Sequence, residues 1–251
     1  MRRVLILGGT TEARRLAERL VGRVDLAVTV SLAGRTTAPA PQAAPARIGG
    51  FGGVEGLARY LINERVDALI DATHPYAAII SANAAAAAAT TRVPLLALRR
   101  APWTPLPGDR WIEVADTAAA VEALGEAPRQ VFLALGKSEI GIFAQAPQHH
   151  YLVRSVDPVD PPLAVPHASY VTGRGPFSEA DDRTLLVTHA IDVVVARNSG
   201  GAATYGKMAA ARALGVPVVL LRRPSSPEVP TVGTVEDAVA WLDHASAFRG
   251  V

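Results

Sequence analysis

An apolar run at residues 4–7 is followed directly by a glycine-containing turn. A helix is expected next, because apolar residues recur at helical spacing over residues 12–20. A turn between a strand and a helix can bind phosphate, since backbone N–H groups and the positive end of the helix dipole meet there. The alternative is a tight turn that binds no ligand. The residues predicted to bind a dinucleotide here are Gly8, Gly9, Thr10, Thr11 and Glu12.

The second expected strand, residues 24–31, indicates which dinucleotide is bound. It ends in Ser31 without a carboxylate, and Arg35 follows soon after. An acidic residue at this position would bind the ribose 2′-hydroxyl of NAD. A hydroxyl and a guanidinium suit a 2′-phosphate instead, because arginine binds phosphate oxygens as a planar fork. The predicted cofactor is therefore NADPH/NADP+, with a solvated surface charge as the alternative role for Arg35.

A polar turn, DATHPY, links a buried strand to a helix expected over residues 76–90. Ligands of open parallel sheets lie beyond the carboxyl ends of the strands, so Asp71 and Thr73 are expected at the cofactor. His74 and Tyr76 are the candidate catalytic residues. An imidazole exchanges a proton near neutral pH, and a phenol forms hydrogen bonds while it packs. The alternative is that Thr73 caps the helix and the two rings only pack.

Strands and helices alternate along the chain, which predicts right-handed βαβ units and parallel sheets. A proline-rich segment, residues 99–110, is the expected domain connection. We therefore expect an α/β fold of two doubly wound Rossmann-like domains, residues 1–101 and 102–251, with cofactor and substrate in the cleft between them. The expected strands are 4–7, 24–31, 47–49, 67–71, 94–98, 131–135, 151–155, 168–172, 192–196 and 218–221. The expected helices are 12–20, 54–64, 76–90, 117–124, 138–144, 178–189, 202–214 and a last helix from Thr234.

The composition excludes several classes of protein. Hydrophobic residues make up 49% of the chain and charged residues 19%, which is typical of a folded globular protein. The chain has no cysteine, so thiolate catalysis, disulfides and cysteine-based zinc sites are excluded. The net charge is only +2 and no basic stripe carries interleaved aromatic residues, so no nucleic-acid partner is expected.

The sequence also predicts no membrane segment and no metal site. No run of 18 apolar residues occurs, and the run at residues 4–7 is too short for a secretory signal. A cytoplasmic location without a membrane partner follows as the expectation. His149 and His150 have no acidic or histidine partner at ligand spacing, so no metal is expected.

Five segments together resemble the precorrin-6A reductase family of cobalamin biosynthesis, which includes the cobalt-precorrin-6A reductases. The resemblance covers nearly the whole chain, and its first two motifs, in this order and spacing, are specific. It implies an NADPH-dependent reduction of one double bond of the precorrin-6A macrocycle to give precorrin-6B, with a hydride to one carbon and a proton to its neighbour. The segments are LILGGTTEAR at 5–14, DATHPYA at 71–77, GPFS at 175–178, RNSGG at 197–201 and GVPVVLLRRP at 215–224.

The implied substrate is a tetrapyrrole with many acetate and propionate groups, and its binding requires cationic or N–H-rich groups. Expected strand ends of the second domain supply such groups, although each arginine alone is more often a surface charge. The RNSGG segment is also expected to open a helix, whose N-terminus suits a carboxylate. Enzymes of neighbouring pathway steps are further candidate partners. The predicted substrate-binding residues are Lys137, Arg154, Arg174, Arg197, Asn198, Ser199, Gly200 and Gly201.

Two other functions remain compatible with these residues. One is an NADP(H)-dependent reductase of another small substrate, and the other is a non-catalytic NADP(H)-sensing protein. Oxidation of bound NADPH on addition of a tetrapyrrole precursor separates the enzyme from the sensor. A metal-free and a cobalt-containing macrocycle are both compatible with the sequence.

Overall fold

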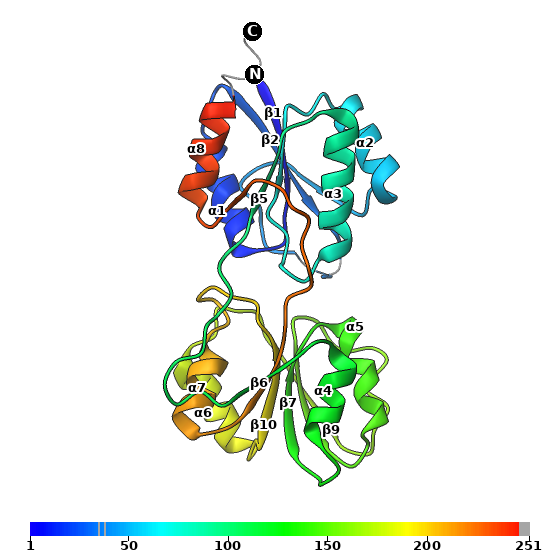
Figure 1. Cartoon of the computed structure of the whole chain (residues 1–251), viewed down its shortest axis with the longest axis vertical. Helices are drawn as coiled ribbons and strands as arrows, with labels where there is room; N and C mark the ends of the chain where they lie inside the picture. The colour runs from blue at the N-terminus through cyan, green and yellow to red at the C-terminus, as the bar shows by residue number, and fades with distance from the viewer. Residues whose placement is uncertain (35, 38, 246–251) are drawn as a thin grey trace. The chain divides into compact units, whose positions relative to one another are not determined.

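The computed structural model describes residues 1–34, 36–37 and 39–245 of the chain. The chain forms two compact units (Figure 1), of which unit 1 comprises Met1–Ala101 and Pro224–Val251 and unit 2 comprises Pro102–Arg223. Each unit contains one six-stranded sheet with helices packed on it, and the strand pairs are parallel. The expected fold of two doubly wound α/β domains is therefore confirmed. Within the described residues, no helix is both long and apolar enough to cross a membrane.

The sheet of unit 1 has the strand order β12-β5-β4-β1-β2-β3. This is the doubly wound Rossmann order, with β12 in the place of the sixth strand. Helices α1 and α8 pack on one face of the sheet, and α2 and α3 pack on the other. The strands are β1 (Arg2–Leu7), β2 (Leu26–Leu32), β3 (Ala46–Ile48), β4 (Ala68–Asp71), β5 (Leu95–Leu98) and β12 (Thr231–Val232). The helices are α1 (Thr11–Leu20), α2 (Gly53–Asn63), α3 (Ala78–Thr91) and α8 (Val235–Ala245).

Strand β1 lies in the middle of this sheet and is buried on both faces. Val4 and Ile6 belong to the cluster formed with α1 and α8, whereas Leu5 and Leu7 belong to the cluster formed with α2 and α3. Successive side chains of a strand point to opposite faces, so a continuous apolar run is required where both faces are covered. This is why the run at residues 4–7 has no polar position.

The sheet of unit 2 has the corresponding order β6-β11-β10-β7-β8-β9. Helices α6 and α7 lie side by side and bury Leu186, Met208 and Ala210 against it. The strands are β6 (Trp111–Val114), β7 (Gln130–Ala134), β8 (His150–Ser155), β9 (Ala168–Thr172), β10 (Val193–Arg197) and β11 (Val218–Leu221). The helices are α4 (Thr117–Leu124), α5 (Lys137–Ile140), the 3-10 helix η1 (Gly141–Gln145), α6 (Glu179–Thr188) and α7 (Gly206–Leu214).

The two units exchange their sixth strands. Strand β6 follows β5 along the chain but pairs with β11 of unit 2, whereas β12 follows β11 but pairs with β5 of unit 1. The N–H of Ala97 donates to the Pro230 carbonyl at 2.8 Å, and that of Arg99 donates to the Val232 carbonyl at 2.9 Å. Unit 2 therefore ends at Arg223 rather than at residue 251 as expected. Neither exchanged strand was predicted, because β12 has two residues and β6 buries only Val114.

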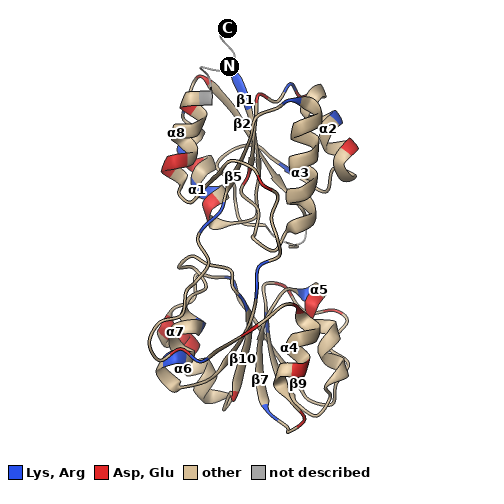
Figure 2. Cartoon of the chain, in the orientation of Figure 1, with Lys and Arg blue, Asp and Glu red and all other residues tan. Residues whose placement is uncertain are grey.

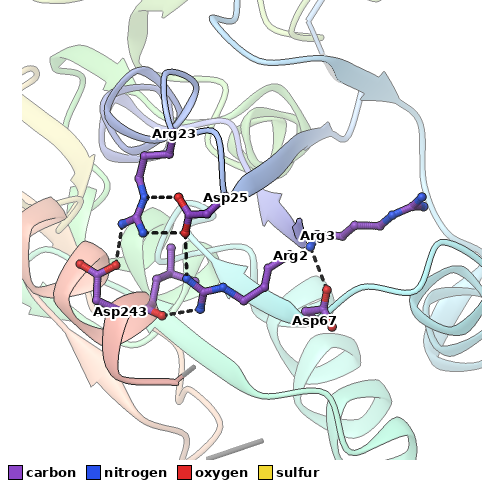
Figure 3. Close-up of polar contacts among 7 residues, drawn as sticks. Arg2, Arg3, Arg23, Asp25, Asp67 and Asp243 are labelled. Carbon is purple, nitrogen blue, oxygen red and sulfur yellow. Dashed lines mark hydrogen bonds and ion pairs between the residues drawn. The ribbon is translucent and has the colours of Figure 1, made fainter. Parts of the chain in front are cut away.

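Polar contacts attach the C-terminal helix α8 to the start of unit 1 (Figure 3). Arg23 contacts Asp243 at 2.5 Å and Asp25 at 2.8 Å, and Arg2 donates to the Leu242 carbonyl at 2.7 Å. The hydrogen bond from Arg23 lowers the pKa of Asp25 to about 2. Burial of Leu242 in the core adds apolar contact to these bonds.

Two helices begin later than expected, and one is divided. Helix α3 begins at Ala78 rather than at residue 76, and α7 begins at Gly206 rather than at residue 202. Gly200 and Gly201 have φ values of +69° and +70°, so the RNSGG segment that precedes α7 is not itself helical. The helix expected over residues 138–144 is the short α5 followed by η1. The last helix, expected from Thr234, is α8, which begins at Val235, and the Thr234 hydroxyl accepts from the Asp237 N–H at 3.1 Å.

Candidate functional site

The carboxyl ends of β1, β2 and β4 are neighbours in unit 1. The register pairs Leu7 of β1 with Ser31 of β2 on one side and with Asp71 of β4 on the other. The chain order reverses between β1 and β4, and open α/β sheets bind ligands at such a switch point. The predicted cofactor residues of three separate segments therefore meet at one edge of the sheet.

The glycine turn has the conformation that a phosphate site needs. Gly9 has a φ of +109°, and a Cβ built on it would have no atom within 4 Å, so the space over the turn is open. A Cβ on Gly8 would instead lie 2.9 Å from Val30 Cγ1, so this glycine allows close packing on β2. Helix α1 then starts at Thr11, where backbone N–H groups lack intrahelical partners. These features fit the pyrophosphate of a dinucleotide.

Thr10 has a structural role at this turn. Its hydroxyl accepts a hydrogen bond from the Ala13 N–H at 3.1 Å, as the N-cap of α1, and donates to the Ala72 carbonyl at 2.8 Å. Both capacities of the hydroxyl are used within the protein. Thr10 thus joins the glycine turn to the turn after β4, and its own N–H is the group that remains suitable for a phosphate.

Arginines neutralise two acidic residues near the turn. Asp71 is 2% exposed and accepts from Arg99 Nη2 at 2.8 Å, from Thr73 Oγ1 at 2.6 Å and from the Thr73 N–H at 3.1 Å. Glu12, in the first turn of α1, accepts from Arg100 Nη1 at 2.7 Å. Both arginines follow β5 and were not predicted as site residues. Their pairing removes negative charge that would repel a phosphate.

His74 and Tyr76 lie in the turn between β4 and α3. The Tyr76 N–H donates to His74 Nδ1 at 3.3 Å, and the two ring centroids are 5.7 Å apart. The Ala77 N–H donates to the His74 carbonyl at 2.8 Å. Since Nδ1 accepts, the neutral imidazole carries its proton on Nε2. The expectation that Tyr76 starts the helix is wrong, because α3 begins two residues later.

At the end of β2, an arginine that was not predicted contacts Ser31. Arg47 of β3 pairs with Ser31 in register, and its Nη1 donates to Ser31 Oγ at 2.8 Å. Its guanidinium lies over the Phe51 ring, 3.9 Å from the centroid. Arg35, the predicted phosphate ligand, lies outside the described residues. Sequence spacing gave no signal for Arg47, because fifteen residues separate it from Ser31 and only strand pairing joins them.

Unit 2 has a switch point of its own, between β7 and β10. Leu135 and Gly136 connect β7 to Lys137, the first residue of α5, and Asn198 follows β10. Lys137 and Asn198 were both predicted to bind substrate from their positions at strand ends. The structure places the two segments side by side. Gly136 lies against Arg197, the last residue of β10, since a Cβ built on Gly136 would lie 2.8 Å from Arg197 Nη2.

Two of the predicted substrate-binding arginines form internal ion pairs. Arg197 contacts Glu139, with Nε donating to Oε1 at 3.0 Å. Arg154 contacts the buried Asp182 and lies over the Phe177 ring at 3.9 Å from its centroid. These pairs neutralise the charges that the prediction assigned to substrate carboxylates. Lys137 and Arg174 are the exposed cations of the predicted set. Figure 2 marks the positions of basic and acidic residues along the ribbon.

Asn198 anchors the segment that enters unit 2. Its Oδ1 accepts from the Trp103 N–H at 2.7 Å, and its Nδ2 donates to the Trp103 carbonyl at 2.9 Å. The Trp103 indole donates to the Gly201 carbonyl at 2.8 Å, and Arg223 donates to the carbonyls of Asn198 and Ser199. The expectation that this loop opens a helix is wrong, because α7 starts only at Gly206.

Among the described residues, no group of three or more histidine and acidic side chains is arranged to hold a metal ion. The candidate site in unit 1 offers backbone N–H groups, hydroxyls, an imidazole and guanidinium groups.

Comparison with known proteins gives one consistent family. The family model for precorrin-6x reductase CbiJ/CobK matches residues 3–243. The chain is 54% identical to a precorrin-6A reductase of Rhodobacter capsulatus, over 100% of both chains. It is 54% identical to one of a Sinorhizobium species, over 96% of this chain and 93% of the relative. A cobalt-precorrin-6A reductase of Priestia megaterium is 27% identical over 95% of this chain and 97% of the relative.

A solved structure agrees with these matches. The structure of a CobK precorrin-6A reductase has a TM-score of 0.94 with this chain and 53% sequence identity. The match covers 98% of this chain and 97% of the other. Similarity at this level includes both units and the elements that carry the site residues.

Removal of the Asp71 carboxylate tests the internal pairing of the site. We expect Asp71→Ala to lower the free energy of unfolding by about 3 kcal/mol, because it leaves the partly buried Arg99 without its anion. Urea titration followed by circular dichroism measures the loss. Glu64→Ala, which removes a half-exposed partner of Arg3, is the control and should cost less than about 1 kcal/mol. Equal small losses in both variants would contradict a stabilising role for Asp71.

Proposed function

The chain belongs to the precorrin-6x reductase family, and from this premise we propose that it reduces one double bond of precorrin-6A with NADPH to give precorrin-6B. The observation that carries the proposal is the glycine turn at the start of α1. It lies at the switch point of unit 1, with Gly9 open above it and the first N–H groups of the helix beside it. This arrangement supports a pyrophosphate, and Ser31 without a neighbouring carboxylate on β2 supports the phosphorylated dinucleotide.

The metal-free macrocycle is the favoured substrate. The two relatives at 54% identity are named precorrin-6A reductases, whereas the cobalt-precorrin-6A reductase of Priestia megaterium is 27% identical. Higher identity over the full length supports the substrate of the former group. Reduction within the cytoplasm stays a prediction.

The reaction adds two electrons and two hydrogens across one carbon–carbon double bond. NADPH, when bound, supplies the hydride. The chain must hold the macrocycle in place and allow a proton to reach the neighbouring carbon. In unit 1, backbone N–H groups of Thr10, Thr11 and Glu12 are proposed to bind the pyrophosphate, while Asp71 and Thr73 hold the turn that presents His74.

His74 is the proposed proton donor, with Tyr76 as a hydrogen-bonding neighbour. As an acid it must act as the imidazolium, which gives up its Nε2 proton and leaves the neutral imidazole, whose Nδ1 accepts from the Tyr76 backbone. The turn follows β4, the strand next to β1, and so lies beside the glycine turn. The rival account is that solvent protonates the substrate and His74 only orders the turn.

The substrate carboxylates are proposed to bind at the switch point of unit 2. Lys137 has an exposed ammonium group that a substrate carboxylate can contact, and the side chain of Arg174 is also exposed. Ser199, Gly200 and Gly201 offer backbone N–H groups in a loop held by Asn198. For Arg154 and Arg197, contact with a carboxylate requires that it share the guanidinium with Asp182 or Glu139.

A single assay tests the proposed activity. Purified protein with NADPH should oxidise it, with loss of its absorbance, only after addition of precorrin-6A, and mass spectrometry should find a product heavier by two hydrogens. Cobalt-precorrin-6A should be reduced more slowly at equal concentration. Binding of NADPH without oxidation in the presence of either substrate would instead support a sensing protein.

Substitution in the glycine turn tests the cofactor site. We expect Gly9→Val to abolish NADPH binding, because its Cβ would occupy the open space over the turn and valine resists a φ of +109°. Titration calorimetry measures binding, and circular dichroism checks the fold. Gly22→Val, on an exposed turn with open space around it, is the control and should bind normally. Tight binding by folded Gly9→Val would place the cofactor elsewhere.

Replacement of His74 tests the proton donor. Asn keeps a hydrogen-bonding side chain but cannot act as an acid, so His74→Asn should lower turnover by about 10²–10⁴-fold with NADPH affinity preserved. Steady-state kinetics and calorimetry separate the two effects. His189→Asn, at an exposed position after α6, is the matched control. Wild-type turnover by His74→Asn would assign the proton to solvent.

A further inference from the structure

Arg47 differs from four other partly buried arginines in the partners it has. Each of those four contacts a carboxylate. Arg47 donates only to neutral oxygens among the described residues: Nη1 to Ser31 Oγ at 2.8 Å and to the Gly49 carbonyl at 2.9 Å, and Nη2 to the Gly50 carbonyl at 3.0 Å. The pairs are Arg99–Asp71, Arg100–Glu12, Arg154–Asp182 and Arg197–Glu139.

The guanidinium of Arg47 is held in a defined position. The carbonyls of Gly49 and Gly50 fix one side of it, and the face of Phe51 lies 3.9 Å from its central carbon. Tyr60 supports Phe51 in an edge-to-face contact, with centroids 5.2 Å apart. Stacking and carbonyl bonds reduce the rotamer freedom that an arginine otherwise loses when it binds a ligand.

The guanidinium of Arg47 lies where the ribose that carries the 2′-substituent of a bound dinucleotide is expected. The residue at the end of the second strand of a Rossmann unit contacts the ribose that carries the 2′-substituent. Ser31 lies at this end of β2, one residue before the last, and Arg47 is bonded to its hydroxyl. An arginine has five N–H donors, and the three bonds to neutral oxygens leave two for phosphate oxygens. The Ser31 hydroxyl accepts from Arg47 and keeps its own proton to donate.

We propose that Arg47, together with Ser31, binds the 2′-phosphate of NADPH and so selects NADPH over NADH. This inference rests on the proposed function, because it assigns a residue to the cofactor of that reaction. A dianionic phosphate supplies the anion that this partly buried cation lacks within the described chain, and the planar fork can bind two of its oxygens. NADH has only a hydroxyl there and gains no charge-assisted bond.

Binding of whole cofactors and of fragments tests the assignment. Arg47→Gln should weaken NADPH and adenosine 2′,5′-bisphosphate by about 10–100-fold, the usual worth of hydrogen bonds to a charged group. NADH and 5′-AMP should change by less than about threefold, because they lack the 2′-phosphate. Titration calorimetry gives the four constants, and NADH binding also shows that the variant is folded. Arg59→Gln, on the exposed side of α2, is the matched control and should leave all four unchanged.

The outcomes separate this inference from the proposed function. If Arg47→Gln weakens binding of NADH and NADPH equally, Arg47 only holds the loop at Gly49 and Gly50, and the inference is overturned. The inference is also overturned if both Arg47→Gln and Arg47→Lys keep the preference for NADPH. In that case reduction of precorrin-6A by the wild type would still support the proposed function. If the wild type binds neither dinucleotide, the inference and the proposed function fail together. Arg47→Lys, which keeps the charge without the fork, should retain part of the preference.

Discussion

The buried carboxylate of Asp71 holds the cofactor end of unit 1 together. It ends β4 at the row of residues where β1 and β2 also end, and it accepts three hydrogen bonds, two from Thr73 and one from Arg99. A buried charge is costly unless such partners surround it, so the turn after β4 and the residue after β5 are held in one arrangement. Thr10 adds a bond to Ala72 in the same turn. The position of His74 beside the glycine turn depends on these contacts.

The charged residues near the two switch points are of two kinds: those that form ion pairs within the protein and those that bond only to neutral groups or are exposed. Carboxylates near the glycine turn and arginines near the second switch point are neutralised within the protein. Positive potential for a ligand phosphate then comes from the start of α1 and from Arg47, whose partners are neutral oxygens. In unit 2 the groups proposed to bind substrate carboxylates are the exposed Lys137 and the backbone N–H groups of the loop that Asn198 anchors. An ion pair therefore positions a site, whereas a cation bonded to neutral groups is available for an anionic ligand.

Because the sixth strands are exchanged, the chain crosses between the two units twice. Strand β6 completes the sheet of unit 2, and β12 completes that of unit 1, where α8 then packs on α1. Unit 1 therefore consists of two separate segments of the chain. The proline-rich connection that sequence analysis identified is real, but a second crossing near Pro224 is needed for the exchange. Asn198 contacts both crossing segments, since it bonds to Trp103 and accepts from Arg223.

Sequence alone determined the alternation of strands and helices, the parallel sheets and the family, because apolar runs, turn glycines and contiguous motifs are local patterns. It also located the glycine turn and the turn after β4, whose residues are consecutive. Tertiary structure decided which charges are used internally and which remain for a ligand. Arg47 meets Ser31 only through pairing of β3 with β2, and Arg99 meets Asp71 only because β5 lies beside β4. The exchange of β6 and β12 was equally beyond local pattern, since the hydrogen bonds that stabilise these short strands come from residues distant in sequence.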